Sequence, residues 1–109
     1  SWKTALEARD ESGGLIEAVT DEQIIEAYKR LADLEGVFVE PASAASVAGV
    51  AMIARRGYFR KHRDRTVVCV LTGHGLKDPG TAMGQFSGGI VVDPDAGETA
   101  RALKLARRK

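Results

Sequence analysis

The sequence predicts an α/β fold, in which part of an open, mostly parallel sheet is flanked by helices. Residues 66–71, Thr-Val-Val-Cys-Val-Leu, are apolar on both faces, as expected for a central strand of a parallel sheet. Residues 20–23 form a helix-initiating capping box, and residues 42–56 are a second helix-forming stretch. Because strand-like and helix-like segments alternate along the chain, a parallel sheet is favoured.

Thr20 and Gln23 predict a helix near residues 21–35. The Thr20 hydroxyl can accept a hydrogen bond from the Gln23 amide, and the Gln23 side chain can reach back to the Thr20 amide. Gly36 stands where helices commonly end in a left-handed residue. The residues between them divide into two faces, as in an amphipathic helix. The apolar face holds Ile24, Ile25, Tyr28, Leu31 and Ala32, and the charged face holds Glu26, Lys29, Arg30 and Asp33.

Shorter segments complete the alternation. The helix at 42–56 is rich in alanine and should therefore pack closely against its neighbours. The basic end of the chain suits the C-terminus of a helix. We interpret residues 1–109 as one portion of a single domain, with residues 88–109 as a strand–helix tail. The predicted short strands cover residues 15–19, 37–40 and 90–92, and the last predicted helix covers residues 96–107.

Composition excludes several classes of function. The net charge of +1 gives no indication of a nucleic-acid partner or of a membrane surface. No apolar run reaches the roughly 18 residues that a membrane span needs. The single cysteine, Cys69, cannot form an internal disulfide and has no metal-ligand spacing around it, so we expect no metal site and a cytoplasmic location.

Two segments follow predicted strands, where ligands bind in parallel sheets. In residues 72–75, Thr-Gly-His-Gly, the glycines permit close backbone approach to a ligand, and the hydroxyl can hydrogen-bond a ring nitrogen. A tight turn without a ligand explains the same residues equally well. In residues 40–46, Glu40 is either a pocket residue or a partner of the following helix dipole.

The same two segments resemble the threonine synthase family. The resemblance rests on residues 40–49, Glu-Pro-Ala-Ser-Ala-Ala-Ser-Val-Ala-Gly, and on residues 68–79, Val-Cys-Val-Leu-Thr-Gly-His-Gly-Leu-Lys-Asp-Pro. Residues 8–14, 18–22 and 33–39 are similar to the same family. The chain resembles the C-terminal third of these enzymes, and its tail matches less well.

The resemblance implies a fold and an activity. The family belongs to the tryptophan-synthase-β-like group of pyridoxal-phosphate (PLP) enzymes, whose cofactor lies between two open sheets. Its members are carbon–oxygen lyases of threonine biosynthesis, converting O-phospho-L-homoserine and water to L-threonine and phosphate. Their Schiff-base lysine and phosphate-binding loop belong to upstream motifs, so we expect no catalytic residue here and an inactive isolated chain.

The resemblance also assigns cofactor-binding residues. Thr72 matches the hydroxyl residue that faces the pyridine nitrogen, Gly73 lets the backbone approach, and Glu40 matches a residue lining the pocket. For His74 we expect a structural hydrogen bond rather than general-base catalysis. Lys77 is not the family's Schiff-base lysine, and a solvated or salt-bridged role is expected.

Two alternatives remain open. One is another enzyme of the same group, such as a serine or threonine dehydratase, although those usually carry Ser-Gly or Cys-Gly where this chain has Thr72-Gly73. The other is a free-standing, non-catalytic binding module. If the chain is part of the synthase, its apolar surfaces should meet the remainder of the enzyme. Alone, it should self-associate, for instance as a homodimer, or bind a partner chain.

Overall fold

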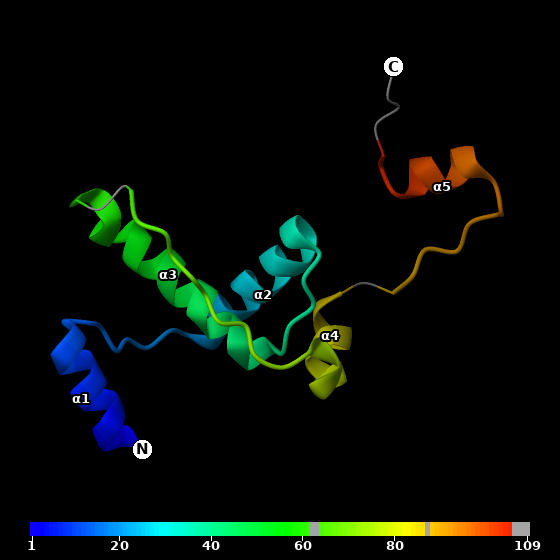
Figure 1. Ribbon diagram of the computed structural model, residues 1–109. Helices are drawn as coiled ribbons and strands as arrows, with labels where there is room; N and C mark the ends of the chain where they lie inside the picture. Colours follow the sequence, from blue (N-terminus) through cyan, green and yellow to red (C-terminus); the bar gives the residue numbers. More distant parts are fainter. Residues whose placement is uncertain (62–63, 87, 106–109) are drawn as a thin grey trace.

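The computed structural model describes residues 1–61, 64–86 and 88–105, and within these ranges all regular structure is helical (Figure 1). Five α-helices are connected by extended segments and three short 3-10 helices. The α-helices are α1 (Trp2–Ser12), α2 (Asp21–Glu35), α3 (Ala45–Arg55), α4 (Pro79–Gln85) and α5 (Ala96–Ala102), and the 3-10 helices are η1 (Pro41–Ala44), η2 (Tyr58–Lys61) and η3 (Gly75–Lys77).

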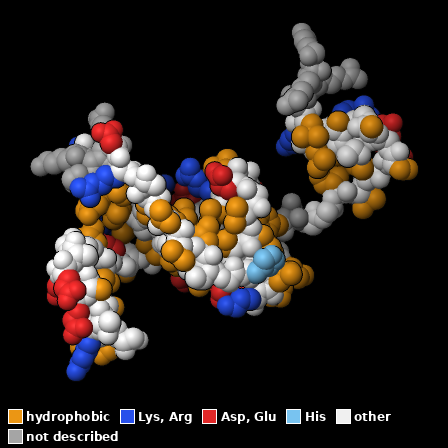
Figure 2. Space-filling view, in the orientation of Figure 1, with side chains coloured by type: hydrophobic (Ala, Val, Ile, Leu, Met, Phe, Trp, Pro, Cys, Tyr) orange, Lys and Arg blue, Asp and Glu red, His pale blue; other side chains and the backbone are white. Residues whose placement is uncertain are grey.

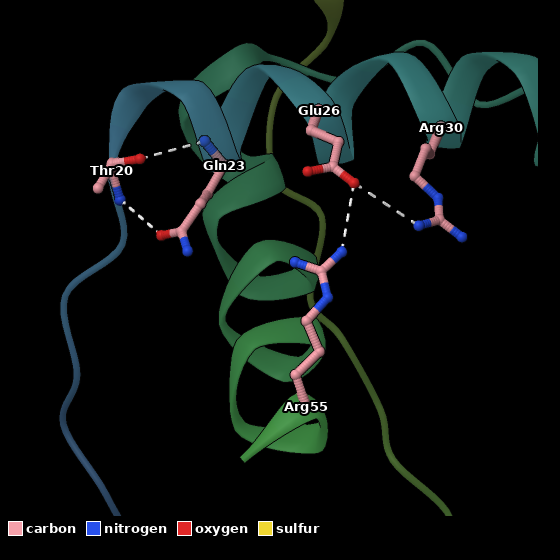
Figure 3. A network of polar contacts seen from close by, with 5 residues as sticks. All are labelled: Thr20, Gln23, Glu26, Arg30 and Arg55. Carbon is pink, nitrogen blue, oxygen red and sulfur yellow. Dashed lines mark hydrogen bonds and ion pairs between the residues drawn. The ribbon is translucent and has the colours of Figure 1, made fainter.

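Helix α2 begins and ends where the sequence predicts. The Gln23 amide donates to Thr20 Oγ1 over 3.3 Å, and the Thr20 amide donates to Gln23 Oε1 over 2.9 Å (Figure 3). Gly36 ends the helix in the left-handed region, with φ 66°. Both ends are therefore fixed by local hydrogen bonds rather than by packing.

Helices α2 and α3 pack together and enclose the small hydrophobic core. The predicted helix at 42–56 is observed, but its first turn is the 3-10 helix η1, with Pro41 at its start. Tyr28 is the largest fully buried side chain, and its ring lies 6.1 Å from that of Phe38 between centroids. Most of the other core side chains are small, so α2 and α3 approach each other closely. The hydrophobic core of the described chain consists of Ala27, Tyr28, Val39, Ala44, Ala48 and Met52.

The predicted strands are not formed in the part of the chain that the structure describes. The segment at 66–71, expected to be a buried central strand, runs extended beside α3 with Val68 82% exposed and Val70 70% exposed. A strand needs neighbouring backbone to pair with its N–H and C=O groups. Among the described residues no second extended segment supplies that ladder, so the expectation of a parallel sheet within this chain is wrong. The same holds for residues 15–19, 37–40 and 90–92.

The last predicted helix is shorter than expected. Helix α5 covers Ala96–Ala102, and Asp95 caps it by accepting from the Glu98 amide over 2.8 Å. Lys104 has a positive φ of 53°, which a continuing right-handed helix cannot accommodate. The end of the predicted range, residues 106–107, lies outside the described residues.

The described chain is elongated. Its Cα radius of gyration is 18.7 Å, against about 13 Å for a compact domain of this size. Helices α1 and α5 stand apart from the α2–α3 pair (Figure 1), and hydrophobic side chains are visible over much of the surface (Figure 2). Val91, for example, is 97% exposed. Within the described ranges, no helix has both the length and the apolar character needed to cross a membrane.

Candidate functional site

The two segments that carry the sequence motifs lie side by side in the structure. The Gly75 amide donates to the Phe38 carbonyl over 3.2 Å, and Ser46 Oγ donates to the Val70 carbonyl over 3.4 Å. The chain between Val70 and Gly75 therefore passes over the start of η1 and α3 (Figure 1). These long-range hydrogen bonds place the segment that contains Thr72 and Gly73 beside the segment that contains Glu40.

Glu40 is held at the start of η1 by its own backbone and by Lys77. The Ser43 amide and hydroxyl both donate to the Glu40 carbonyl, over 3.0 and 2.8 Å. Its carboxylate accepts from Lys77 Nζ over 2.6 Å, and the Glu40 side chain is 27% exposed. The Glu40 backbone is therefore held by Ser43, and one oxygen of its carboxylate is held by a charge-assisted hydrogen bond from Lys77.

Gly73 lies directly against Glu40. Its φ is 68°, a left-handed conformation that glycine adopts without strain. A Cβ at this position would overlap the Glu40 carboxylate and would lie 2.9 Å from the Glu40 Cβ. Gly73 therefore approaches Glu40 closely, and its approach to a ligand stays a prediction.

Thr72, which precedes Gly73, is exposed. Its hydroxyl has no hydrogen-bond partner among residues 1–61, 64–86 and 88–105. A free hydroxyl beside a fixed carboxylate and a glycine can donate to a ring nitrogen of a bound group.

His74 and Lys77 have structural contacts. His74 Nδ1 accepts from the Leu76 amide over 3.2 Å, and the imidazole meets the Phe38 ring edge-on with centroids 5.5 Å apart. The expectation of a structural hydrogen bond for His74 is confirmed. Lys77 forms the salt bridge with Glu40 that was one of its two expected roles.

Sequence reasoning missed a second polar cluster, at Asp78. Its carboxylate caps α4 by accepting from the Thr81 amide over 3.0 Å and from Thr81 Oγ1 over 2.6 Å. The Thr81 hydroxyl and then its amide hold the pKa of Asp78 below its ordinary value. Asp followed by Pro79 is a recognisable helix start, so this signal was available in the sequence.

Tyr28 lies close enough to Asp78 to feel its charge. It is 1% exposed, and its hydroxyl has no partner among the described residues. Burial, and secondarily the Asp78 carboxylate, raise the pKa of the Tyr28 phenol, so the phenol stays protonated. Hydrophobic periodicity places Tyr28 on the apolar face of α2 but could not predict that it packs against Phe38 and Phe86.

The described part of the chain holds no group of three or more His, Cys, Asp or Glu side chains close enough to bind a metal ion.

Comparison with known proteins agrees with the sequence resemblance. The family model described as "Pyridoxal-phosphate dependent enzyme" matches residues 3–73. A threonine synthase of Halalkalibacterium halodurans is 53% identical over 87% of this chain and 26% of its own length. Those of Methanocaldococcus jannaschii and Mycobacterium leprae are 49% and 47% identical, over 92% and 96% of this chain and 24% and 29% of their own lengths.

The chain belongs to the family of pyridoxal-phosphate-dependent enzymes, and the family implies the tryptophan-synthase-β-like fold. Its resemblance to threonine synthases is confirmed at about half identity over most of its length. The chain spans about a quarter of the length of these relatives.

The residues present fit one end of PLP. The pyridine nitrogen needs a hydrogen-bond donor, and the exposed Thr72 hydroxyl is free to supply one. The adjacent Gly73 has no side chain that could block the ring. Lys77 is paired with the Glu40 carboxylate. Thr72 and Gly73 are thus chemically compatible with the pyridine end of the cofactor.

Proposed function

We propose that this chain is the C-terminal part of a PLP-dependent threonine synthase, which converts O-phospho-L-homoserine and water to L-threonine and phosphate. In this proposal residues 1–109 belong to the catalytic domain and supply the pyridine side of its cofactor pocket. The observation that carries it is the exposed Thr72 next to Gly73, which lies against Glu40, in a chain 53% identical to a threonine synthase.

Each of these three residues has a distinct part in this proposal. When bound, PLP supplies an electron sink for chemistry at the carbons of the amino-acid substrate. The Thr72 hydroxyl donates to the pyridine nitrogen, and because a hydroxyl is a poor acid, it leaves that nitrogen unprotonated. Gly73 allows the ring to approach the backbone, and Glu40 forms the adjoining wall.

The proposal also accounts for the extended, exposed segments. Residues 66–71 are apolar on both faces, which suits a strand that pairs on both edges with strands of the remainder of the enzyme. The exposed side chains of Val67, Val68 and Val70 would be covered there. We accordingly propose that the mostly parallel sheet forms between this chain and the remainder of the enzyme. Residues 88–109 would be a terminal strand–helix unit of that sheet.

The partners and location follow from the same assignment. The substrate is a small phosphorylated amino acid, and the principal macromolecular partner is the remainder of the same enzyme. Separated from it, the chain would cover its apolar surface by forming a homodimer or by binding another chain. We place the enzyme in the cytoplasm. A serine or threonine dehydratase is less well supported, because the relatives at about half identity are threonine synthases.

Substitution of Thr72 in the complete enzyme tests the proposal. Thr72→Val keeps the shape of the side chain and removes the hydroxyl. Loss of its hydrogen bond should cost about 1–3 kcal/mol, which is roughly 5- to 150-fold in PLP affinity. Thr72→Ser keeps the hydroxyl and should be mild. Thr4→Val, on the exposed side of α1, is the matched control. A Thr72→Val enzyme that binds PLP and turns over like the parent would overturn the assignment.

A further inference from the structure

The salt bridge between Lys77 and Glu40 connects the two motif segments across the rim of the site. Lys77 Nζ donates to Glu40 Oε2 over 2.6 Å, a short contact typical of a charge-assisted hydrogen bond. The lysine side chain is 61% exposed and that of Glu40 is 27% exposed. A pair this open to water contributes little to the stability of the fold.

We propose that Lys77 is a positioning residue for the cofactor pocket: by holding the Glu40 carboxylate it fixes the loop at 72–77, and with it the direction of the Thr72 hydroxyl. This inference rests on the proposed function, because it takes Thr72 as the donor to the pyridine nitrogen.

The contacts around the loop support this role. Thr72 makes no side-chain hydrogen bond within the described residues, so among them only the position of its backbone can orient the hydroxyl. That backbone is pressed onto Glu40 at Gly73, where no side chain would fit. The Gly75 amide of the same loop donates to the Phe38 carbonyl. The loop then turns, and the Lys77 amide donates to the His74 carbonyl over 2.9 Å.

The loop at 72–77 therefore contacts Glu40 at two points. Gly73 packs against the Glu40 side chain, and Lys77 pairs with its carboxylate. Removal of the ammonium would leave the Glu40 carboxylate free to rotate against Gly73. Small displacements of groups that position a ligand are costly even where the fold is intact. The expected effect of losing Lys77 is thus on cofactor binding and on the spectrum of bound PLP, and not on the unfolding transition.

The test uses the complete enzyme and PLP itself. Lys77→Met removes the charge and keeps the length, Lys77→Arg restores a charge that can pair with the carboxylate, and Glu40→Gln removes the other partner. Lys3→Met, at the exposed start of α1, is the matched control. For each variant we would measure the PLP dissociation constant by fluorescence titration, the absorption and circular-dichroism spectra of bound PLP, and the urea midpoint.

We expect Lys77→Met to weaken PLP affinity about two- to fivefold, which corresponds to the free energy of a partly exposed ion pair. The spectrum of bound PLP should change, Lys77→Arg should restore both properties, and the urea midpoint should match that of Lys3→Met. In a Glu40→Gln background, Lys77→Met should have no further effect, since the pair is already broken.

A second double-mutant cycle, with Thr72→Val, separates this inference from the proposed function. If Lys77 acts through Thr72, its replacement should lose its effect on PLP affinity once the hydroxyl is gone. A Thr72→Val effect with additive or absent Lys77→Met effects would overturn the inference alone. A Thr72→Val enzyme that resembles the parent would overturn the proposed function and this inference together.

Discussion

Gly75 donates its amide to the carbonyl of Phe38 over 3.2 Å, and its Cα lies directly against the Phe38 ring. This contact fixes the distance between the segment that carries Thr72 and the segment that carries Glu40. Gly75 is buried, and its backbone φ is not positive. A glycine is therefore required here because there is no space for a side chain, and not because of the backbone conformation.

Gly75→Ala should therefore destabilise the protein. The new Cβ would overlap the Phe38 ring, which must move, and such overpacking costs about 1–3 kcal/mol. Gly84→Ala in α4 is the matched control, because a Cβ there meets nothing within 4 Å and alanine favours a helix by about 1 kcal/mol. Urea unfolding of both variants in the complete enzyme gives the comparison. Equal midpoints would contradict the close packing at Gly75.

Gly73→Ala should weaken PLP affinity as well as stability. The substitution meets two penalties: the left-handed backbone, which costs about 1–2 kcal/mol for a residue with a Cβ, and overlap with Glu40. Gly36→Ala meets only the first, since its φ is 66° and nothing lies within 4 Å. PLP titration of the two variants isolates the second penalty. Equal PLP affinities would show that Gly73 is needed for its backbone alone.

Asp78 should make the start of α4 sensitive to acid. The Thr81 hydroxyl and amide depress the folded-state pKa of Asp78. The ionised Asp78 therefore contributes to folding stability above its unfolded-state pKa, and this contribution is lost as pH falls through the folded-state pKa. Thr81→Val removes the first of these two hydrogen bonds and should raise the pKa of Asp78 towards its ordinary value. Carbon NMR of the Asp78 carboxyl across the acidic range measures the change. An unchanged titration in Thr81→Val would assign the lowered pKa to the amide alone.

The isolated chain should not be labelled by PLP at a single site. Lys77 is engaged by Glu40, and we have proposed that the chain holds only the pyridine end of the cofactor. Borohydride reduction in the presence of PLP, followed by peptide mapping, should therefore give only low and scattered labelling of lysines. Stoichiometric labelling at Lys77 would show that the aldehyde end of the cofactor lies on this chain.

Local chemistry made much of the helical structure readable from the sequence. The capping box at Thr20 and the left-handed Gly36 fix both ends of α2, because each depends on residues within a few positions. Glu40, Thr72 and Gly73 were selected from resemblance and not from spacing, and the structure places Gly73 against Glu40. The assignment of Thr72 to the cofactor stays a prediction.

Two features were decided only by tertiary structure. The pairing of Lys77 with Glu40 depends on how residues far apart in the sequence are brought together, which no local pattern encodes. The segment at 66–71 shows the converse: its apolar residues determine that it should be buried, yet its strand hydrogen bonds must come from other backbone, and none of the described residues supplies them. Hydrophobic pattern is a property of the segment itself, whereas a β-ladder is a property of the segment and its partners.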